Sequence, residues 1–169
     1  MGEDMSDMSP EDGREADAPP PEVTPATREP GNPPDNNPPG RKLPGWRNRL
    51  TAFLRDNHAR PFAPGRWDCA IWTAGAVEAM TGEDHLRGFR GYRSIAEGKR
   101  RLQARGFADH VAYVASLLPE VPPAFAQPGD VAVLAGQSLG IVQGAQVYVL
   151  GINGFGTLPF TVIERAFRV

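Results

Sequence analysis

The sequence is poor in the residues that staple small secreted domains and bind metals. It contains one cysteine, Cys69, and three histidines in 169 residues. A single cysteine cannot form an intrachain disulfide, so a disulfide-stapled fold is excluded. The histidines are scattered and show no zinc-ligand spacing, so we expect no metal site and no cofactor.

Long apolar runs are also missing. No stretch approaches the roughly eighteen apolar residues that cross a bilayer. The acidic start of the chain lacks the basic and apolar regions of a signal peptide. We therefore expect synthesis in the cytoplasm and no membrane segment.

Residues 1–43 have almost no large aliphatic and no aromatic side chains. They carry ten acidic residues against four basic ones, a net charge of −6, and proline runs such as APPPE. Such a composition buries too little apolar surface to offset the entropy cost of ordering. We predict a disordered, acidic, proline-rich tail over residues 1–43 and one folded domain over residues 44–169.

The predicted domain carries a net charge of +4, partly in KRRLQAR, from Lys99 to Arg105. Aromatic residues do not interleave these charges, as a stacking platform for nucleic acid would require. An anionic partner such as nucleic acid or a wall polymer is the alternative, but we interpret these charges as a solvated helix face and find no evidence for nucleic-acid binding.

Helical patterns fill the first part of the domain. Apolar spacing predicts a helix from Trp46 to near His58, and a second from Cys69 to about Thr81, between the N-cap Asp68 and the stop Gly82. Two more are predicted, from Ser94 to Gly106 and from His110 to Leu118. Apolar residues point in nearly every direction from the second helix, which indicates the central helix of the domain.

The second part of the domain has the character of β-structure. Short strands are predicted at VAVLA, LGIVQ and VYVLG, and a last one near PFTVIE. Helices followed by a small antiparallel sheet indicate an α+β fold.

Cys69 has two interpretations. At the first turn of a helix, unpaired backbone N–H groups and the helix dipole favour a thiolate, and the same groups could hold a developing oxyanion. The carboxylate of Asp68 opposes ionisation unless it is turned onto the helix cap. The alternative is a structural cysteine, because free cysteine is among the residues most often buried.

The order of the motifs resembles a known group of enzymes. An aromatic–Asp–Cys opening of a helix that ends in glycine, followed by PGDVAVL and LGIVQG, is similar to NlpC-type cysteine peptidases. These compact papain-like enzymes cut peptide cross-links or stems in bacterial cell walls. The resemblance implies a Cys-bearing central helix packed on a small C-terminal antiparallel sheet.

Residues 46–169 more closely resemble a small family of unknown function encoded by tailed phages and prophages, itself similar to NlpC-type domains. The shared motifs are the Asp-Cys helix, RGFRGYRS, the Gly-Asp turn at Gly129 and Asp130, LGIV, and the ending RAFRV.

The resemblance implies that Cys69 matches the peptidase nucleophile. The peptidase base is a histidine that opens an H-V-G-I strand, and Ser138 matches it here. A serine hydroxyl neither accepts a proton near neutral pH nor stabilises a thiolate as an imidazolium does. His85 is predicted about 20 Å from Cys69, beyond the far end of the helix, whereas His58 and His110 stay open as replacement bases.

Two hypotheses follow. In the first, a phage or prophage tail-associated NlpC-like domain without the usual catalytic histidine acts as a structural, assembly or cell-wall-binding component of a virion. Its partners would be other tail proteins or peptidoglycan. In the second, the domain is a cysteine hydrolase of peptidoglycan peptide or another amide, with Cys69 as nucleophile and a non-standard base. The serine at position 138 favours the first.

Overall fold

A computed structural model describes residues 41–169 of the chain. The predicted tail therefore lies outside the described residues, except for its last three. Leu43 N–H donates to the carbonyl of Met80 at 2.8 Å, and the Lys42 ammonium lies 3.3 Å from Asp130. The packed part of the chain thus includes residues on the tail side of the predicted boundary.

The helices lie where the sequence predicts them. In the described segment they are α1 (Trp46–Asn57), α2 (Cys69–Thr81), α3 (Ile95–Gln103) and α4 (His110–Leu117). The side chains of Asp68, Ser94 and Asp109 accept a first-turn N–H of α2, α3 and α4, respectively, which is why these three helices begin where they do.

Six antiparallel strands form one sheet. They are β1 (Glu120–Val121), β2 (Val131–Leu134), β3 (Ser138–Gln143), β4 (Gln146–Gly151), β5 (Gly154–Pro159) and β6 (Arg165–Phe167), with short 3-10 turns η1 (Pro123–Phe125), η2 (Ala135–Gln137) and η3 (Phe160–Val162). The order across the sheet is β1-β6-β2-β3-β4-β5. The fold class is α+β, as predicted.

The end of the sheet differs from the prediction. The stretch PFTVIE forms η3 after Pro159, and the last strand is β6. The glycine-rich segment that starts with GFG, a composition that disfavours a strand locally, forms β5 instead, and β5 pairs along the whole of β4. At the end of this hairpin Phe160 N–H donates to the Ala145 carbonyl at 3.0 Å, which turns the chain away from the sheet.

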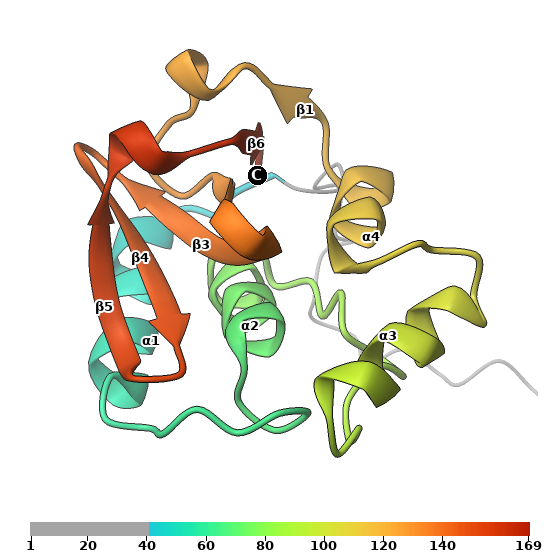
Figure 1. Ribbon diagram of the computed structural model, residues 1–169. Helices are drawn as coiled ribbons and strands as arrows, with labels where there is room; N and C mark the ends of the chain where they lie inside the picture. Colours follow the sequence, from blue (N-terminus) through green and yellow to red (C-terminus); the bar gives the residue numbers. More distant parts are fainter. Residues whose placement is uncertain (1–40) are drawn as a thin grey trace, which may run out of the picture. The chain divides into compact units, whose positions relative to one another are not determined.

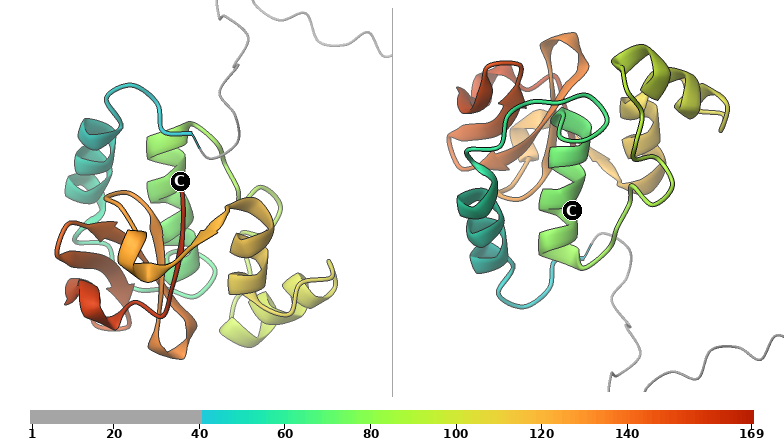
Figure 2. Two further views of the ribbon diagram at one scale, coloured as in Figure 1. Left: turned by 90° about the horizontal axis from the view of Figure 1, so that it is seen from above. Right: turned by 90° about the horizontal axis from the view of Figure 1, so that it is seen from below.

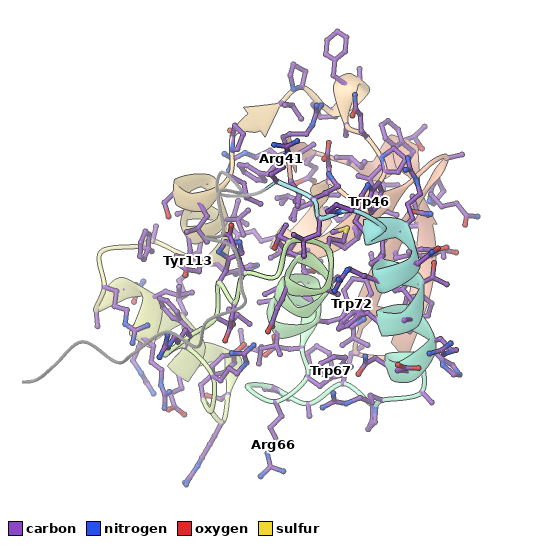
Figure 3. The ribbon with its side chains drawn as sticks, turned by 180° about the vertical axis from the view of Figure 1, so that it is seen from behind. Arg41, Trp46, Arg66, Trp67, Trp72 and Tyr113 are labelled. Atoms are coloured by element: carbon purple, nitrogen blue, oxygen red, sulfur yellow. The ribbon has the colours of Figure 1, made fainter. Side chains whose placement is uncertain are left out.

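The core lies between the sheet and the first two helices. Figures 1 and 2 show α1 and α2 side by side against one face of the sheet. The side chain of Trp72 on α2 is 0 % exposed. It lies with Trp67 between α1 and α2 (Figure 3), and the Trp72 ring centroid is 6.1 Å from that of Phe53 on α1. The helix α2 therefore occupies the centre of the domain, as predicted from its apolar residues.

Both faces of the middle of the sheet are covered. Val131 and Val133 of β2 face the helices, whereas Ala132 and Leu134 belong to a second apolar cluster that includes Phe160 of η3. This accounts for the continuous apolar run VAVL, since a strand buried on both faces has no polar side.

The helices α3 and α4 stand beside this core as a separate pair (Figures 1 and 2). Tyr113 of α4 joins them to the preceding loop: its ring lies 4.7 Å from that of Phe89 and 5.0 Å from that of Phe107, and its hydroxyl donates to the His85 carbonyl. The space between this pair and α2 contains the candidate site.

Candidate functional site

A buried carboxylate sets the position of Cys69. Asp68 is 1 % exposed. Its Oδ1 accepts the Ile71 N–H at 3.1 Å, and its Oδ2 accepts the Gly65 N–H at 2.8 Å and the hydroxyl of Tyr92. Burial and the bond to Asp68 raise the pKa of Tyr92, so its hydroxyl stays protonated and donates. Asp68 is thus turned onto the helix cap, the orientation in which it opposes the thiolate least.

The turn before the helix requires glycine at position 65. Gly65 has φ +71, and a Cβ there would lie 1.6 Å from the carbonyl oxygen of Tyr92. The Gly65 carbonyl also accepts the N–H of Gly91 at 3.1 Å. The loop that carries Tyr92 is therefore bonded directly to the turn that presents the thiol.

The Cys69 thiol is partly buried and faces backbone donors. Burial raises the pKa of this thiol, and the charge of Asp68 raises it further. The N–H groups of Leu139 on β3 and Ala70 on α2 act in the opposite direction. The upward shift prevails, so the expected help from the helix N-terminus does not produce a thiolate near neutral pH.

A pocket of about 380 Å³ opens beside the thiol, between α2, the α3–α4 pair and the start of β3. Cys69 and Ser138 line it, together with His85 and His110. His58 does not: it is exposed, and its Nδ1 lies 2.7 Å from the Arg55 carbonyl at the end of α1. Two of the three histidines, His85 and His110, therefore line the pocket.

His85 reaches the pocket although it lies beyond the far end of α2. Its Nε2 is 3.6 Å from Glu83 Oε2, too long for a hydrogen bond, and has no other partner among the described residues. The pocket runs along α2, so a residue can line it without approaching Cys69.

His110 lies next to the position of the missing peptidase histidine. Its Nε2 is 2.6 Å from the carbonyl oxygen of Gln137, the residue before Ser138. A carbonyl can only accept, so Nε2 carries the proton and a neutral ring has its lone pair on Nδ1. The Gln137 amide in turn donates to Asp109 Oδ2 at 3.0 Å.

Asp109 fixes this arrangement at the start of α4. Its Oδ1 accepts the Ala112 N–H at 2.8 Å, and this bond together with the Gln137 amide lowers the pKa of Asp109. Gln137 has φ 64, an unusual value for a residue other than glycine. The 3-10 turn η2 and the start of α4 are thus bonded to each other just before Ser138. Ser138 itself is exposed and lines the pocket.

Residues 41–169 match the model of a family described as Domain of unknown function (DUF6950). The chain belongs to this family. No curated protein matches the sequence. The DUF6950 domain begins at Arg41, which agrees with the contacts of Lys42 and Leu43 described above.

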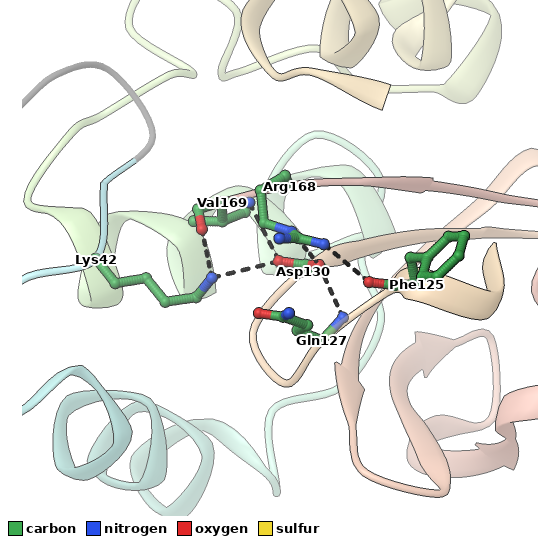
Figure 4. A network of polar contacts seen from close by, with 6 residues as sticks. All are labelled: Lys42, Phe125, Gln127, Asp130, Arg168 and Val169. Carbon is green, nitrogen blue, oxygen red and sulfur yellow. Dashed lines mark hydrogen bonds and ion pairs between the residues drawn. The ribbon is translucent and has the colours of Figure 1, made fainter. Parts of the chain in front are cut away.

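Several motif residues of the DUF6950 domain bond to one another away from the pocket. Asp130, of the Gly-Asp turn, is 0 % exposed. It accepts the guanidinium of Arg168 at 2.8 Å, the Gln127 N–H at 2.8 Å and the Val169 N–H at 3.3 Å, as well as the Lys42 ammonium (Figure 4). The ending RAFRV is thus tied to the turn that opens β2.

Sequence reasoning missed the polar groups that come from other elements. Thr73 lines the pocket one helical turn beyond Cys69, and Gln137 joins His110 to Asp109. The spacing of Cys69 and Thr73 on one helix face was readable as i, i+4. No local sequence pattern predicts the contact between the start of α4 and η2.

Two further findings concern the described residues as a whole. Within residues 41–169 no group of three or more His, Cys, Asp or Glu side chains could hold a metal ion. Over the same range none of the helices has the length and apolarity to cross a membrane.

Proposed function

We propose that the DUF6950 domain is an NlpC-like binding domain without peptidase activity. In this proposal it belongs to a phage or prophage tail, where it contacts other tail proteins or peptidoglycan. The proposal combines the motif resemblance with the chemistry at Cys69. The family match and the α+β fold of the domain are compatible with the proposal.

The observation that carries the proposal is the surroundings of the thiol. Ser138 stands at the start of β3, where the resemblance places the peptidase histidine, and the Leu139 N–H faces the sulfur. The pKa of Cys69 is set by burial, by the charge of Asp68 and by backbone N–H groups. None of the described histidines contributes to it. A neutral thiol without a base at hand is a poor nucleophile.

Alkylation of Cys69 by iodoacetamide is expected to be slower at pH 7 than that of a cysteine in an unfolded peptide. The reason is the raised pKa: only the thiolate reacts, and its fraction grows only as pH rises towards a value above the ordinary one. The rate should therefore increase with pH along a curve displaced to higher pH. Mass spectrometry of the labelled chain measures this rate.

The control is the same chain in urea, where the rate should return to that of the peptide. Rapid labelling of the native protein below neutral pH would contradict the proposal, because it requires a stabilised thiolate.

A peptidoglycan assay tests the function itself. Purified cell-wall sacculi should retain wild type and Cys69→Ala equally in a pelleting experiment, without release of soluble peptide fragments. Release by wild type but not by Cys69→Ala would reject the binding role in favour of hydrolysis. If neither protein pellets with sacculi, the cell-wall part of the proposal is wrong.

One arrangement favours a second candidate, a cysteine hydrolase with a non-standard base. His110 lines the same pocket as Cys69, and its bond to the Gln137 carbonyl leaves Nδ1 as the proton acceptor. A base oriented by a third group is the pattern of nucleophilic catalysis. In this candidate Nδ1 of His110 would take the thiol proton after a movement of α4.

Comparison of wild type with His110→Gln separates the candidates. If His110 is the base, wild type should cleave an amide substrate and His110→Gln should be inactive, because the glutamine amide cannot accept the thiol proton. His58→Gln is the matched control, because His58 is exposed at the end of α1. Under the binding proposal none of the three proteins cleaves.

A further inference from the structure

The two edge strands of the sheet differ in length and charge. The strand order leaves β1 with β6 as its one neighbour and β5 with β4. β1 contains two residues, and its Glu120 forms an ion pair with Arg165 of β6 at 2.8 Å. β5 contains six residues without a charged side chain and lies at the outer side of the sheet (Figure 1). Short or charged edges resist pairing with another chain, whereas a long uncharged edge favours it.

The β4–β5 hairpin fixes which backbone groups of β5 point away from the sheet. Gly154 pairs with the last residue of β4 across a two-residue turn. At the other end Phe160 N–H donates to the Ala145 carbonyl at 3.0 Å. Bonded and non-bonded residues alternate along an antiparallel pair. The even-numbered residues of β5 therefore bond to β4, and the odd-numbered residues direct their backbone groups outward.

Three residues of β5 thus offer backbone groups at the open edge. Phe155 and Thr157 each direct an N–H and a carbonyl outward, and neither bonds through its backbone to a further element of the described segment. Pro159 offers only its carbonyl, because proline has no N–H. Thr157 and Pro159 are exposed, so another strand can reach this edge.

The surroundings of the β5 edge are uncharged and include exposed apolar side chains. No charged residue occurs from Val131 to Ile163. Ile152 in the turn is 83 % exposed, and Leu158 on β5 is 41 % exposed. A partner recognised by its charge finds no charged group on β3, β4 or β5. A second copy of the chain is not repelled there, since a two-fold axis at this edge brings no like charges of these strands together.

We propose that the chain forms a dimer in which β5 pairs antiparallel with β5 of a second copy, about a two-fold axis at Gly156. In this register Phe155 of each copy faces Thr157 of the other, and both N–H groups and both carbonyls of these residues are bonded. An axis at Thr157 would instead place Pro159, which lacks an N–H, opposite the Phe155 carbonyl. The dimer goes beyond the proposed function and does not depend on it.

The side chains fit the same register. Leu158 of one copy lies opposite Gly154 of the other, where no side chain competes for the space. Apart from its chain neighbours, no described residue would come within 4 Å of a Cβ at Gly154. Pairing therefore covers the exposed Leu158 with the hairpin end that also carries Ile152, and removal of this apolar surface from water favours the dimer.

Sedimentation equilibrium of the full chain over about 10 µM to 1 mM, a range that covers weak protein interfaces, tests the dimer. We expect the weight-average mass to rise from that of one chain towards that of two. Leu158→Lys should raise the dissociation constant about tenfold, because it removes the apolar contact and adds a charge at the edge. Thr157→Pro should weaken the dimer as well, since it removes one outward N–H from each copy. Circular dichroism shows whether each variant is folded.

Ile95→Lys is the matched control. Ile95 is also an exposed apolar residue, and its helix α3 lies on the other side of the domain from β5 (Figures 1 and 2). This variant should dimerise as wild type does. A dissociation constant of Leu158→Lys equal to that of Ile95→Lys would overturn the proposal. A wild type that stays monomeric would also overturn it and would leave the β5 edge to an extended segment of a different protein.

Disulfide trapping tests the register, in chains that also contain Cys69→Ala. The Cα atoms of a non-hydrogen-bonded pair are about 4.5 Å apart, which a disulfide bridges, so Gly156→Cys should cross-link to a dimer under mild oxidation. Leu158→Cys should not, because the two residues at position 158 lie about 13 Å apart along the strands. Cross-linking of Gly156→Cys no faster than that of Leu158→Cys would overturn the placement of the axis.

Discussion

Replacing Asp130 with alanine is expected to lower the free energy of unfolding by about 4 kcal/mol. The carboxylate is fully buried and accepts the guanidinium of Arg168, the ammonium of Lys42 and two backbone N–H groups. Alanine would leave these donors without their acceptor. Burial already lowers the pKa of Lys42, so loss of its counterion would disfavour the ammonium further. Urea unfolding of the full chain, followed by circular dichroism, measures the change.

Two variants show whether the loss comes from the carboxylate. Asp130→Asn keeps the shape and one acceptor oxygen, so it should fall between wild type and Asp130→Ala. Glu164→Ala removes an exposed carboxylate at the other end of the β2–β6 pair and should change stability by less than about 0.5 kcal/mol. A loss in Asp130→Ala no larger than that of Glu164→Ala would mean that the network does not stabilise the fold.

Replacing Asp68 with alanine is expected to cost about 3 kcal/mol, of which about 1 kcal/mol is loss of the helix cap and the rest is the unsatisfied Gly65 N–H and Tyr92 hydroxyl. These partners hold the start of α2 and the loop around Tyr92 together. The same variant should change the alkylation rate of Cys69, because the turn that presents the thiol loses its bonds. Urea unfolding and the labelling assay measure the two effects on one preparation.

Tyr92→Phe separates the contributions, since it removes one donor and keeps the ring. Its expected cost is about 1 kcal/mol. Asp56→Ala is the surface control, because Asp56 is exposed on α1 and its carboxylate bonds to the side chain of the exposed Arg55. If Asp68→Ala and Asp56→Ala have equal stability, the buried carboxylate does not hold the start of α2.

Local signals were sufficient for the helices. Asp68, Ser94 and Asp109 have side chains that cap helices, and each does so. The same reasoning failed at PFTVIE, where apolar and β-branched residues suggested a strand. There the pairing of GFG with β4 decides the outcome, and tertiary pairing is not contained in the propensity of either segment.

The state of the thiol could not be predicted from its neighbours in sequence. A cysteine at a helix N-terminus is usually expected to ionise more easily, yet burial raises the pKa of Cys69. The thiol faces the Leu139 N–H of β3, a strand that the local sequence does not place beside it. For the same reason the contact between His110 and Gln137, which are 27 residues apart, could not be predicted from the sequence. The serine at position 138 could be read from the sequence itself.

The Asp130 network also governs how the domain can open. Lys42 bonds both to Asp130 and to the carbonyl of Val169, 127 residues away along the chain. Fraying of either end of the described segment therefore removes a partner from the other end. The first and last residues of a domain often exchange their amide hydrogens early, through local opening. Here one carboxylate makes the two ends part of a single cooperative unit, and their amides should become exposed to solvent together.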